Sequence, residues 1–206
     1  MQEDPKENLD LFDEHEEVVS EDGKEVKRRG IFLLPNLLTT AALFSGFFSI
    51  ISAIDGNFVS AGMAIFAAQM LDGLDGRVAR LTNSQSAFGA QYDSLSDVIS
   101  FGLAPAIIIF LWGLNSIGQA GWIFSFLYVA AAALRLARFN TYLGSEDNFF
   151  KGLPSPIAGA MIVYFVWAMS SYGIQGEEVG RTLAVSSAVM TGIVSLLMVS
   201  LSSKRL

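Results

Sequence analysis

Six long apolar stretches dominate this chain and limit what it can fold into. Each is close to the roughly 20 residues that a helix needs to cross a lipid bilayer. They cover residues 31–54, 58–76, 92–113, 119–138, 154–173 and 181–202. The composition agrees, because only 16% of the residues are charged, against about a quarter in soluble domains. We therefore predict an all-α integral membrane protein, with six transmembrane helices in one domain, residues 31–206.

The first 30 residues differ in composition from the rest. They hold 11 of the 20 acidic residues and 5 of the 13 basic residues, and acidic segments with few aromatic residues are typical of disorder. They also lack the apolar core of a cleaved signal peptide. We expect residues 1–30 to form a disordered cytoplasmic tail.

Two kinds of site are excluded or disfavoured by composition. The chain has no cysteine, so it can form neither disulfides nor thiolate metal sites. Its few basic residues are spread thinly along the sequence and provide no basic face for a nucleic acid. We therefore expect no nucleic-acid partner.

The basic residues also predict the orientation of the helices. With six spans, ten of the 13 basic residues fall near span ends on one side of the membrane, and such an excess marks the cytoplasmic side. Arg181 is the basic residue of the opposite side. Both termini, and the loops after the second and fourth spans, are therefore predicted to face the cytoplasm.

Four aspartates lie in or beside the second and third spans. A charged side chain at membrane depth costs about 2.5–3.5 kcal/mol, so four of them need compensation. Helical periodicity places Asp72 and Asp75 on one face. Asp93 and Asp97 are four residues apart and form a stripe on the next helix. If these two faces oppose each other, four carboxylates meet.

Carboxylates so close cannot all stay ionised without a cation. Oxygen ligands without His or Cys suit hard cations such as Mg²⁺, Mn²⁺ or Ca²⁺, and four carboxylates can bridge two ions, an arrangement that clamps phosphoryl groups. Gly76, Ala79 and Arg80 share the face of Asp72. The two small residues leave room either for a ligand or for close helix packing.

These residues resemble the motif of the CDP-alcohol phosphotransferase family, D-x2-D-G-x2-A-R-x8-G-x3-D-x3-D. Residues 72–97 read DGLDGRVARLTNSQSAFGAQYDSLSD and keep every spacing. Within the family, the chain is most similar to the membrane-embedded (type II) phosphatidylserine synthases. That likeness rests on PNLLT at 35–39, RLARFN at 135–140 and KGLPSP at 151–156.

The resemblance implies a role for each of these positions. Asp72, Asp75 and Asp93 would bind metal, and Asp97 would both bind metal and act as the general base, with two Mg²⁺ or Mn²⁺ ions. The residues implied to bind the CDP-lipid are Asn36, Thr39, Gly76, Ala79, Arg80 and Ser86. By their charge, polarity and position, the residues expected to bind serine or a phosphate are Arg135, Arg138, Asn140, Lys151 and Ser155. The implied substrates are CDP-diacylglycerol and L-serine. The other implied partners are membrane lipids and a second copy of the chain, in a homodimer.

Other functions stay open at this point. The aspartate motif does not specify the acceptor alcohol, so glycerol 3-phosphate or inositol is an alternative to serine. The basic residues at 135, 138 and 151 can equally set topology and bind anionic headgroups. A divalent-cation transporter would spread its carboxylates across the membrane depth, whereas these cluster on one side. A catalytically inactive scaffold is disfavoured because no motif position is missing.

Overall fold

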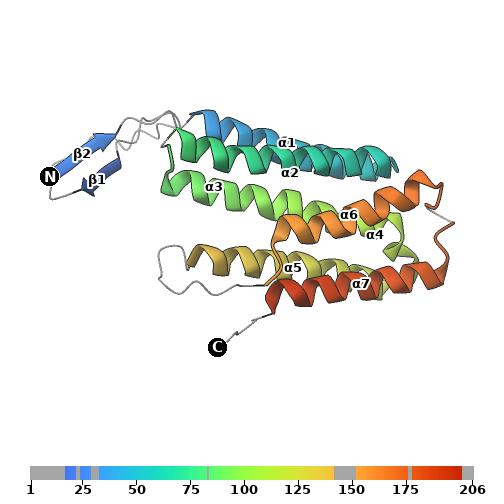
Figure 1. The fold of residues 1–206 in the computed structure, drawn as a ribbon. Coiled ribbons are helices and arrows are strands. Elements are labelled where there is room, and N and C mark those ends of the chain that lie inside the picture. The colour runs from blue at the N-terminus through green and yellow to red at the C-terminus, as the bar shows by residue number, and fades with distance from the viewer. Residues whose placement is uncertain are drawn as a thin grey trace, which may run out of the picture.

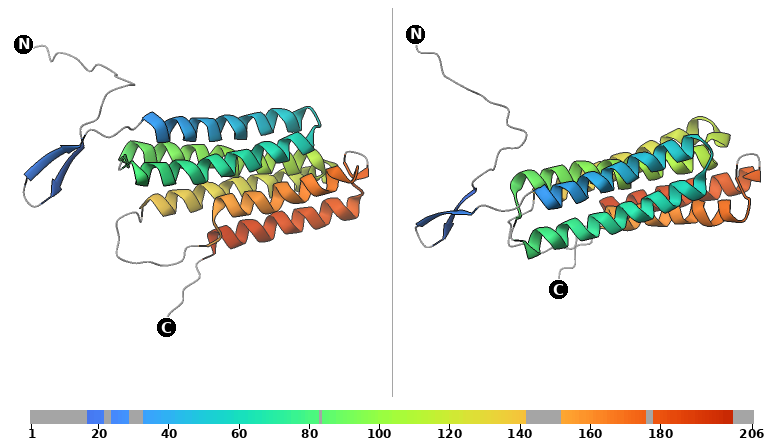
Figure 2. Two further views of the ribbon diagram at one scale, coloured as in Figure 1. Left: turned by 45° about the horizontal axis from the view of Figure 1, so that its top comes forward. Right: turned by 90° about the horizontal axis from the view of Figure 1, so that it is seen from above.

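The computed structural model describes residues 17–21, 24–28, 33–82, 84–141, 152–175 and 178–200. Within these ranges the chain forms six helical rods that alternate in direction (Figures 1 and 2). The rods, in chain order, are α1 (Leu33–Ile54), α2 (Phe58–Leu81), the composite of α3 (Ala87–Asp97), η1 (Val98–Leu103) and α4 (Ala104–Trp112), α5 (Gln119–Thr141), α6 (Ser155–Ser171) and α7 (Arg181–Val199). A short 3₁₀ helix, η2 (Leu114–Ile117), precedes α5.

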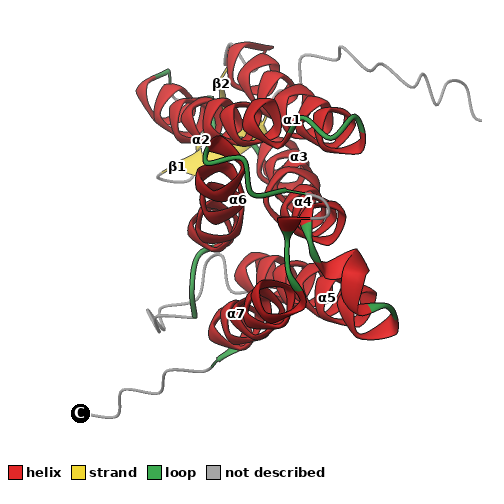
Figure 3. Ribbon diagram, turned by 90° about the vertical axis from the view of Figure 1, so that its right-hand side faces the viewer, coloured by secondary structure: helices red, strands yellow, loops and turns green. Residues whose placement is uncertain are grey.

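The rods lie in three layers when viewed along their axes (Figure 3). One outer layer holds α1 and α2, the middle layer holds α6 and the composite rod, and the other outer layer holds α5 and α7. The composite rod of α3, η1 and α4, called the middle rod below, contacts both α1 and α5. Alternating direction places the end of α2, the start of α3 and the end of α5 at the same end of the bundle (Figure 1).

Four helices are long and apolar enough to cross a membrane. These are Leu34–Ile54, Ala87–Trp112, Gln119–Asn140 and Arg181–Val199. The prediction of six spans is therefore confirmed for four of the rods. The other two differ for separate reasons: α6 has only 17 residues, about 25 Å at 1.5 Å per residue, and the last turns of α2 carry two aspartates and two arginines. The protein is a multi-pass integral membrane protein.

Two predicted boundaries were wrong around the aspartate motif. We expected the second span to end at residue 76 and the third to begin at residue 92, but α2 continues to Leu81 and α3 begins at Ala87. The side chain of Ser86 caps α3 by accepting a hydrogen bond from the backbone N–H of Gly89 at 2.9 Å. This N-cap satisfies a donor that a helix start would otherwise leave unpaired, so α3 begins within the aspartate motif, before its last three fixed positions.

A two-stranded hairpin precedes the helices. Strand β1 (Glu17–Glu21) pairs antiparallel with β2 (Lys24–Arg28) in the segment that we expected to be disordered (Figure 2). For these 10 residues the prediction differs from the structure. Val19 is paired with Val26 across the two strands, and valine is a residue that strands favour. The rest of the predicted tail lies outside the described residues.

The middle rod contains a π-helical segment, η1, directly after Asp97. Pro105 has no backbone N–H, so the carbonyl of Phe101, four residues earlier, loses its α-helical donor. The hydroxyl of Tyr128 on α5 supplies a replacement, donating to that carbonyl at 2.9 Å. Both Tyr128 and Phe101 are fully buried. The Tyr128 side chain therefore holds the irregular turn against α5, directly after the part of the rod that carries Asp93 and Asp97.

Replacing Tyr128 by Phe tests this bond. Tyr128→Phe leaves the Phe101 carbonyl buried without its side-chain donor, which should lower the free energy of unfolding by about 1 kcal/mol. Unfolding in mixed micelles, followed by far-UV circular dichroism, measures the change. Tyr172→Phe is the matched control, because Tyr172 is 84% exposed. Equal stability of the two variants would contradict the proposed fastening.

Candidate active site

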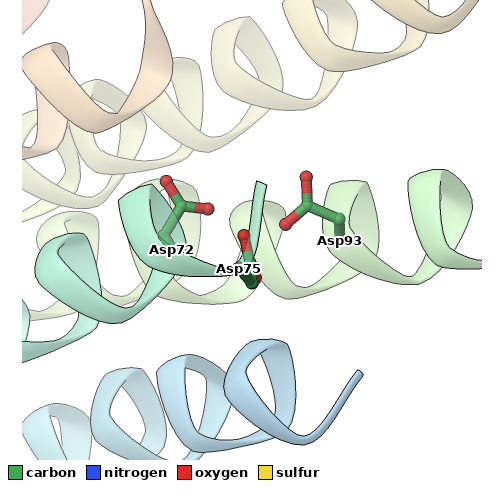
Figure 4. A group of neighbouring side chains, drawn as sticks. All are labelled: Asp72, Asp75 and Asp93. Atoms are coloured by element: carbon green, nitrogen blue, oxygen red, sulfur yellow. The ribbon is translucent and has the colours of Figure 1, made fainter. Parts of the chain in front are cut away.

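Three carboxylates from two helices meet near the end of the bundle. One oxygen from each of Asp72, Asp75 and Asp93 lies within 4.8 Å of the others. Figure 4 shows Asp93, from α3, beside Asp72 and Asp75, from α2. Asp75 is buried and the other two are half-buried. The predicted opposition of the two acidic faces is therefore confirmed for these three residues.

The surroundings of the cluster fit a hard cation. Thr39 on α1 donates a hydrogen bond of 2.7 Å to Asp75 Oδ2, so that oxygen is held in place by a neighbouring helix. Asp93 Oδ1 is buried and has no hydrogen-bond partner. A buried, unpaired carboxylate oxygen is costly, and carboxylates are the ligands that Mg²⁺ and Mn²⁺ favour. The donor set and the unpaired oxygen together fit a divalent metal site.

Asp97 stands beside this group of three. It lies one turn after Asp93 on α3, and its carboxyl group interacts electrostatically with that of Asp72. The guanidinium of Arg135 on α5 attracts the same carboxyl group. Asp97 therefore joins the carboxylate cluster to α5, and its expected role as a metal ligand stays a prediction.

A cavity of about 440 Å³ opens next to the carboxylates. Asp75 and Asp93 belong both to its wall and to the carboxylate cluster. All six residues expected to bind the CDP-lipid line this cavity: Asn36, Thr39, Gly76, Ala79, Arg80 and Ser86. Its volume is in the range of ordinary small-molecule sites. Any ligand that fills it has one end against the carboxylates.

Glycines shape the cavity in two ways. A Cβ added to Gly76 would meet nothing within 4 Å, so this glycine faces open space and leaves the helix backbone accessible. A Cβ added to Gly89 would come within 3.1 Å of Ser86 Oγ and 3.5 Å of Asn36 Oδ1. Gly89 therefore allows α3 to approach α1 closely. The open space at Gly76 favours a ligand there over close helix packing, whereas the neighbours of Gly89 indicate close packing.

The residues expected to bind serine or phosphate are divided by the structure. Arg135 Nη1 donates to Ser155 Oγ at 2.7 Å, and Arg135 Nε is buried without a partner. Arg138 Nη1 instead donates to the Val199 carbonyl at 3.2 Å. Asn140 accepts a hydrogen bond from Ser94 on α3 at 3.1 Å. The first pair adjoins Asp97, whereas the other two residues connect helices. Lys151 lies outside the described residues.

Two features of the site were missed from the sequence. Thr39 was expected to contact the nucleotide, and its bond to Asp75 was not foreseen, because the two residues are 36 positions apart in the sequence. Phe139 also lines the cavity. Its position between Arg138 and Asn140, within the segment already singled out, was a sequence signal that could have found it.

Comparison with known proteins agrees with this geometry. The family described as CDP-alcohol phosphatidyltransferase matches residues 32–199. The chain belongs to this family. The expected resemblance is confirmed, and the match covers all six rods of this CDP-alcohol phosphatidyltransferase.

Several relatives carry names for a reaction. A CDP-diacylglycerol–serine O-phosphatidyltransferase of Helicobacter pylori is 41% identical over 165 residues, which is 79% of this chain and 69% of the relative. The protein of that name from Mycobacterium tuberculosis is 40% identical over 68% of this chain and 51% of its own. An archaetidylserine synthase of Methanothermobacter thermautotrophicus is 42% identical over 64% of this chain and 57% of its own. The chain thus spans between half and about 70% of the length of these relatives.

The open space at Gly76 makes a testable prediction. Gly76→Leu would place a side chain in the cavity and should weaken binding of CDP, in the presence of Mg²⁺, at least tenfold, or about 1.4 kcal/mol. Gly73→Leu is the matched control, because a Cβ there also meets nothing within 4 Å but Gly73 does not line the cavity. Isothermal titration in detergent measures both. Equal affinities would contradict the assignment of the cavity.

Proposed function

We propose that this protein is a CDP-diacylglycerol–serine O-phosphatidyltransferase, which makes phosphatidylserine and CMP from CDP-diacylglycerol and L-serine. One observation carries the proposal: Asp75 and Asp93 belong at once to the cavity and to the carboxylate cluster. A nucleotide-lipid in the cavity therefore has its phosphates at the candidate metal site. Relatives that carry this name, at about 40% identity, support serine as the acceptor.

Asp72, Asp75 and Asp93 would hold the divalent metal, with Asp97 as a further ligand and two Mg²⁺ or Mn²⁺ ions in all. Bound there, the metal supplies Lewis-acid stabilisation of the charge that develops on the phosphates and on the leaving CMP. Thr39 keeps one oxygen of Asp75 turned toward α1. This bond fixes the direction of the carboxylate before any substrate arrives.

The cavity residues would hold the CDP part of the lipid. Gly76 and Ala79 leave the backbone of α2 open to the nucleotide, and Asn36 and Ser86 present polar atoms from α1 and from the start of α3. Arg80 is exposed, and its Nε donates to the Gly76 carbonyl at 2.9 Å. That bond uses only Nε, so the two terminal guanidinium nitrogens of Arg80, which lines the cavity, are available to a phosphate oxygen. Arginine binds phosphates well because its guanidinium can donate two parallel hydrogen bonds.

Asp97 would act as the general base. It accepts the proton of the serine hydroxyl while the serine oxygen bonds to the phosphorus that carries the lipid, and the bond from that phosphorus to the CMP oxygen breaks. A carboxylate is a weak base for an alcohol, so alignment contributes much of the acceleration. Arg135, fixed by Ser155 and attracted to Asp97, is placed to bind the serine carboxylate through its unpaired Nε.

The arrangement in the membrane completes the proposal. Six spans with both termini in the cytoplasm would place the carboxylates near the inner leaflet, where soluble serine meets a lipid whose acyl chains stay in the bilayer. Arg80 and Arg138 stand at this end of the bundle and Arg181 at the other, as the excess of basic residues on cytoplasmic loops requires. A homodimer is part of the proposal by family resemblance.

The direct test offers alcohols to purified protein. With CDP-diacylglycerol and Mg²⁺ or Mn²⁺, L-serine should release CMP, whereas glycerol 3-phosphate and inositol should release little. Thin-layer chromatography of the lipid product identifies the acceptor. A chelator should abolish turnover, and added metal should restore it. Release of CMP with another alcohol but not with serine would replace the acceptor, and full turnover after chelation would reject the metal mechanism.

Two aspartate variants separate binding from chemistry. Asp97→Asn removes the base but keeps most of the ligands, so we expect CDP and Mn²⁺ to bind within a few-fold of wild type while turnover falls at least 10³-fold, within the range typical of general-base loss. Asp72→Asn should weaken Mn²⁺ binding itself. Electron paramagnetic resonance of free Mn²⁺ measures binding, and CMP release measures turnover. Equal losses of binding in both variants would contradict this division of roles.

A further inference from the structure

A polar connection joins α2 to α6 one turn before the carboxylate cluster. Gln69 Nε2 donates to the Pro156 carbonyl at 2.6 Å, and the Tyr164 hydroxyl donates to Gln69 Oε1. Both partners lie on α6, so one side chain uses its donor and its acceptor on the same neighbouring helix. None of these three residues lines the cavity or belongs to the carboxylate cluster.

This connection continues toward the reacting groups. Gln69 lies three residues before Asp72 and so shares its face of α2. On α6, Pro156 follows Ser155, whose hydroxyl receives the hydrogen bond of Arg135. The polar groups thus form a path from α2, through the first turn of α6, to α5. The position of Ser155 relative to the carboxylates depends on where Gln69 holds that first turn.

The membrane environment increases the effect of the two Gln69 hydrogen bonds on the position of α6. An amide in an apolar bilayer has no water with which to replace lost partners, so the two bonds favour one placement of α6 along α2. The helix is short, with 17 residues, and begins with Ser155 and Pro156. The bond from Gln69 to the Pro156 carbonyl therefore acts on the first turn of α6, together with the close packing of Gly159 against Phe101 and Pro105.

We propose that Gln69 and Tyr164 are positioning residues for the acceptor alcohol. They act through α6, by setting the place of Ser155 and thereby of Arg135, and they do not touch the substrate. The inference deepens the proposed function, because it takes from it that the acceptor is L-serine. The chemical class it concerns is an alcohol with a carboxylate, bound by a guanidinium.

The two substrates should respond differently to loss of this connection. Among the described residues, the cavity is built from α1, α2, α3, the turn between α2 and α3, and Phe139 of α5, and no residue of α6 lines it. Helix α2 packs mainly against α1, which keeps the cavity in place when contacts to α6 are lost. Displacement should therefore fall on α6 and on the Ser155–Arg135 pair.

Kinetics test the first consequence. Gln69→Met, which keeps the length of the side chain without its polar atoms, should raise the KM for L-serine about tenfold and leave the KM for CDP-diacylglycerol within about twofold. Tyr164→Phe removes one of the two bonds and should have a smaller effect in the same direction. The double variant should be no worse than Gln69→Met, since both act through one connection. Tyr172→Phe, at the exposed residue directly after α6, is the control and should match wild type.

Distance measurements test the second consequence without relying on activity. The chain has no cysteine, so spin labels can be attached to pairs of introduced cysteines. Leu81→Cys with Ile157→Cys reports α2 against α6, and Leu37→Cys with Leu81→Cys reports α1 against α2; all three positions are exposed. Gln69→Met should broaden or shift the first distance distribution and leave the second unchanged.

The outcomes separate this inference from the proposed function. An equal rise in both KM values, or wild-type kinetic constants with only a lower melting temperature, would overturn the positioning role. An unchanged distance between α2 and α6 would overturn it as well. Failure of wild-type protein to release CMP with L-serine would overturn the proposed function, while the distance measurement would still decide whether Gln69 places α6.

Discussion

Mutual repulsion among closely spaced carboxylates is the constraint on which the site depends. Three of them place oxygens within 4.8 Å of one another, with Asp75 buried and the other two half-buried, and partial burial weakens the screening of their charge by water. Such a cluster is tolerable only with a cation or with shared protons. The surrounding helices hold the groups in place: Thr39 binds Asp75, and Arg135 attracts Asp97. The same repulsion that makes the cluster costly makes it a candidate site for a divalent metal.

The cluster also divides the site into two sides with different helices. The cavity side is built mainly from α1, α2 and α3. The other side is formed where Arg135 on α5 meets Ser155 on α6. A displacement at phosphorus needs its attacking and leaving oxygens roughly in line. In the proposed reaction, two helix groups on either side of shared carboxylates would provide that separation, and each would recognise one of the two substrates.

Much of this arrangement could be predicted from the sequence, because the constraints involved are local. Hydrophobic length located the six rods, and helical periodicity brought Asp72 and Asp75 onto one face. Contacts between distant segments could not be predicted in the same way. The bond from Thr39 to Asp75 crosses 36 residues, and that from Arg138 to Val199 crosses 61. No periodicity encodes such pairs.

Two local predictions failed for a different reason. The boundaries of α2 and α3 were drawn where the apolar character fades, yet Ser86 shows that a helix starts where its backbone is capped. The hairpin of β1 and β2 arises in an acidic segment because backbone pairing does not require an apolar composition. Composition predicts whether a segment lies in water or in lipid, whereas backbone hydrogen bonds decide whether it is a helix or a strand and where that element begins.

The π-helical turn η1 has a consequence for how the middle rod fits its neighbours. It inserts an extra residue between the acidic half of the middle rod and its apolar half. The side chains of one half are therefore rotated about the rod axis, relative to those of the other half, from where a continuous α-helix would place them. The half after the turn, α4, is packed in the core of the bundle, with Ile108, Ile109 and Trp112 fully buried. Deleting one residue from Val98–Leu103 would turn the two halves relative to each other by about 100°. The irregular turn therefore lets one rod fit its carboxylates to α2 and its apolar side chains to the core, although a continuous α-helix would not bring both into place.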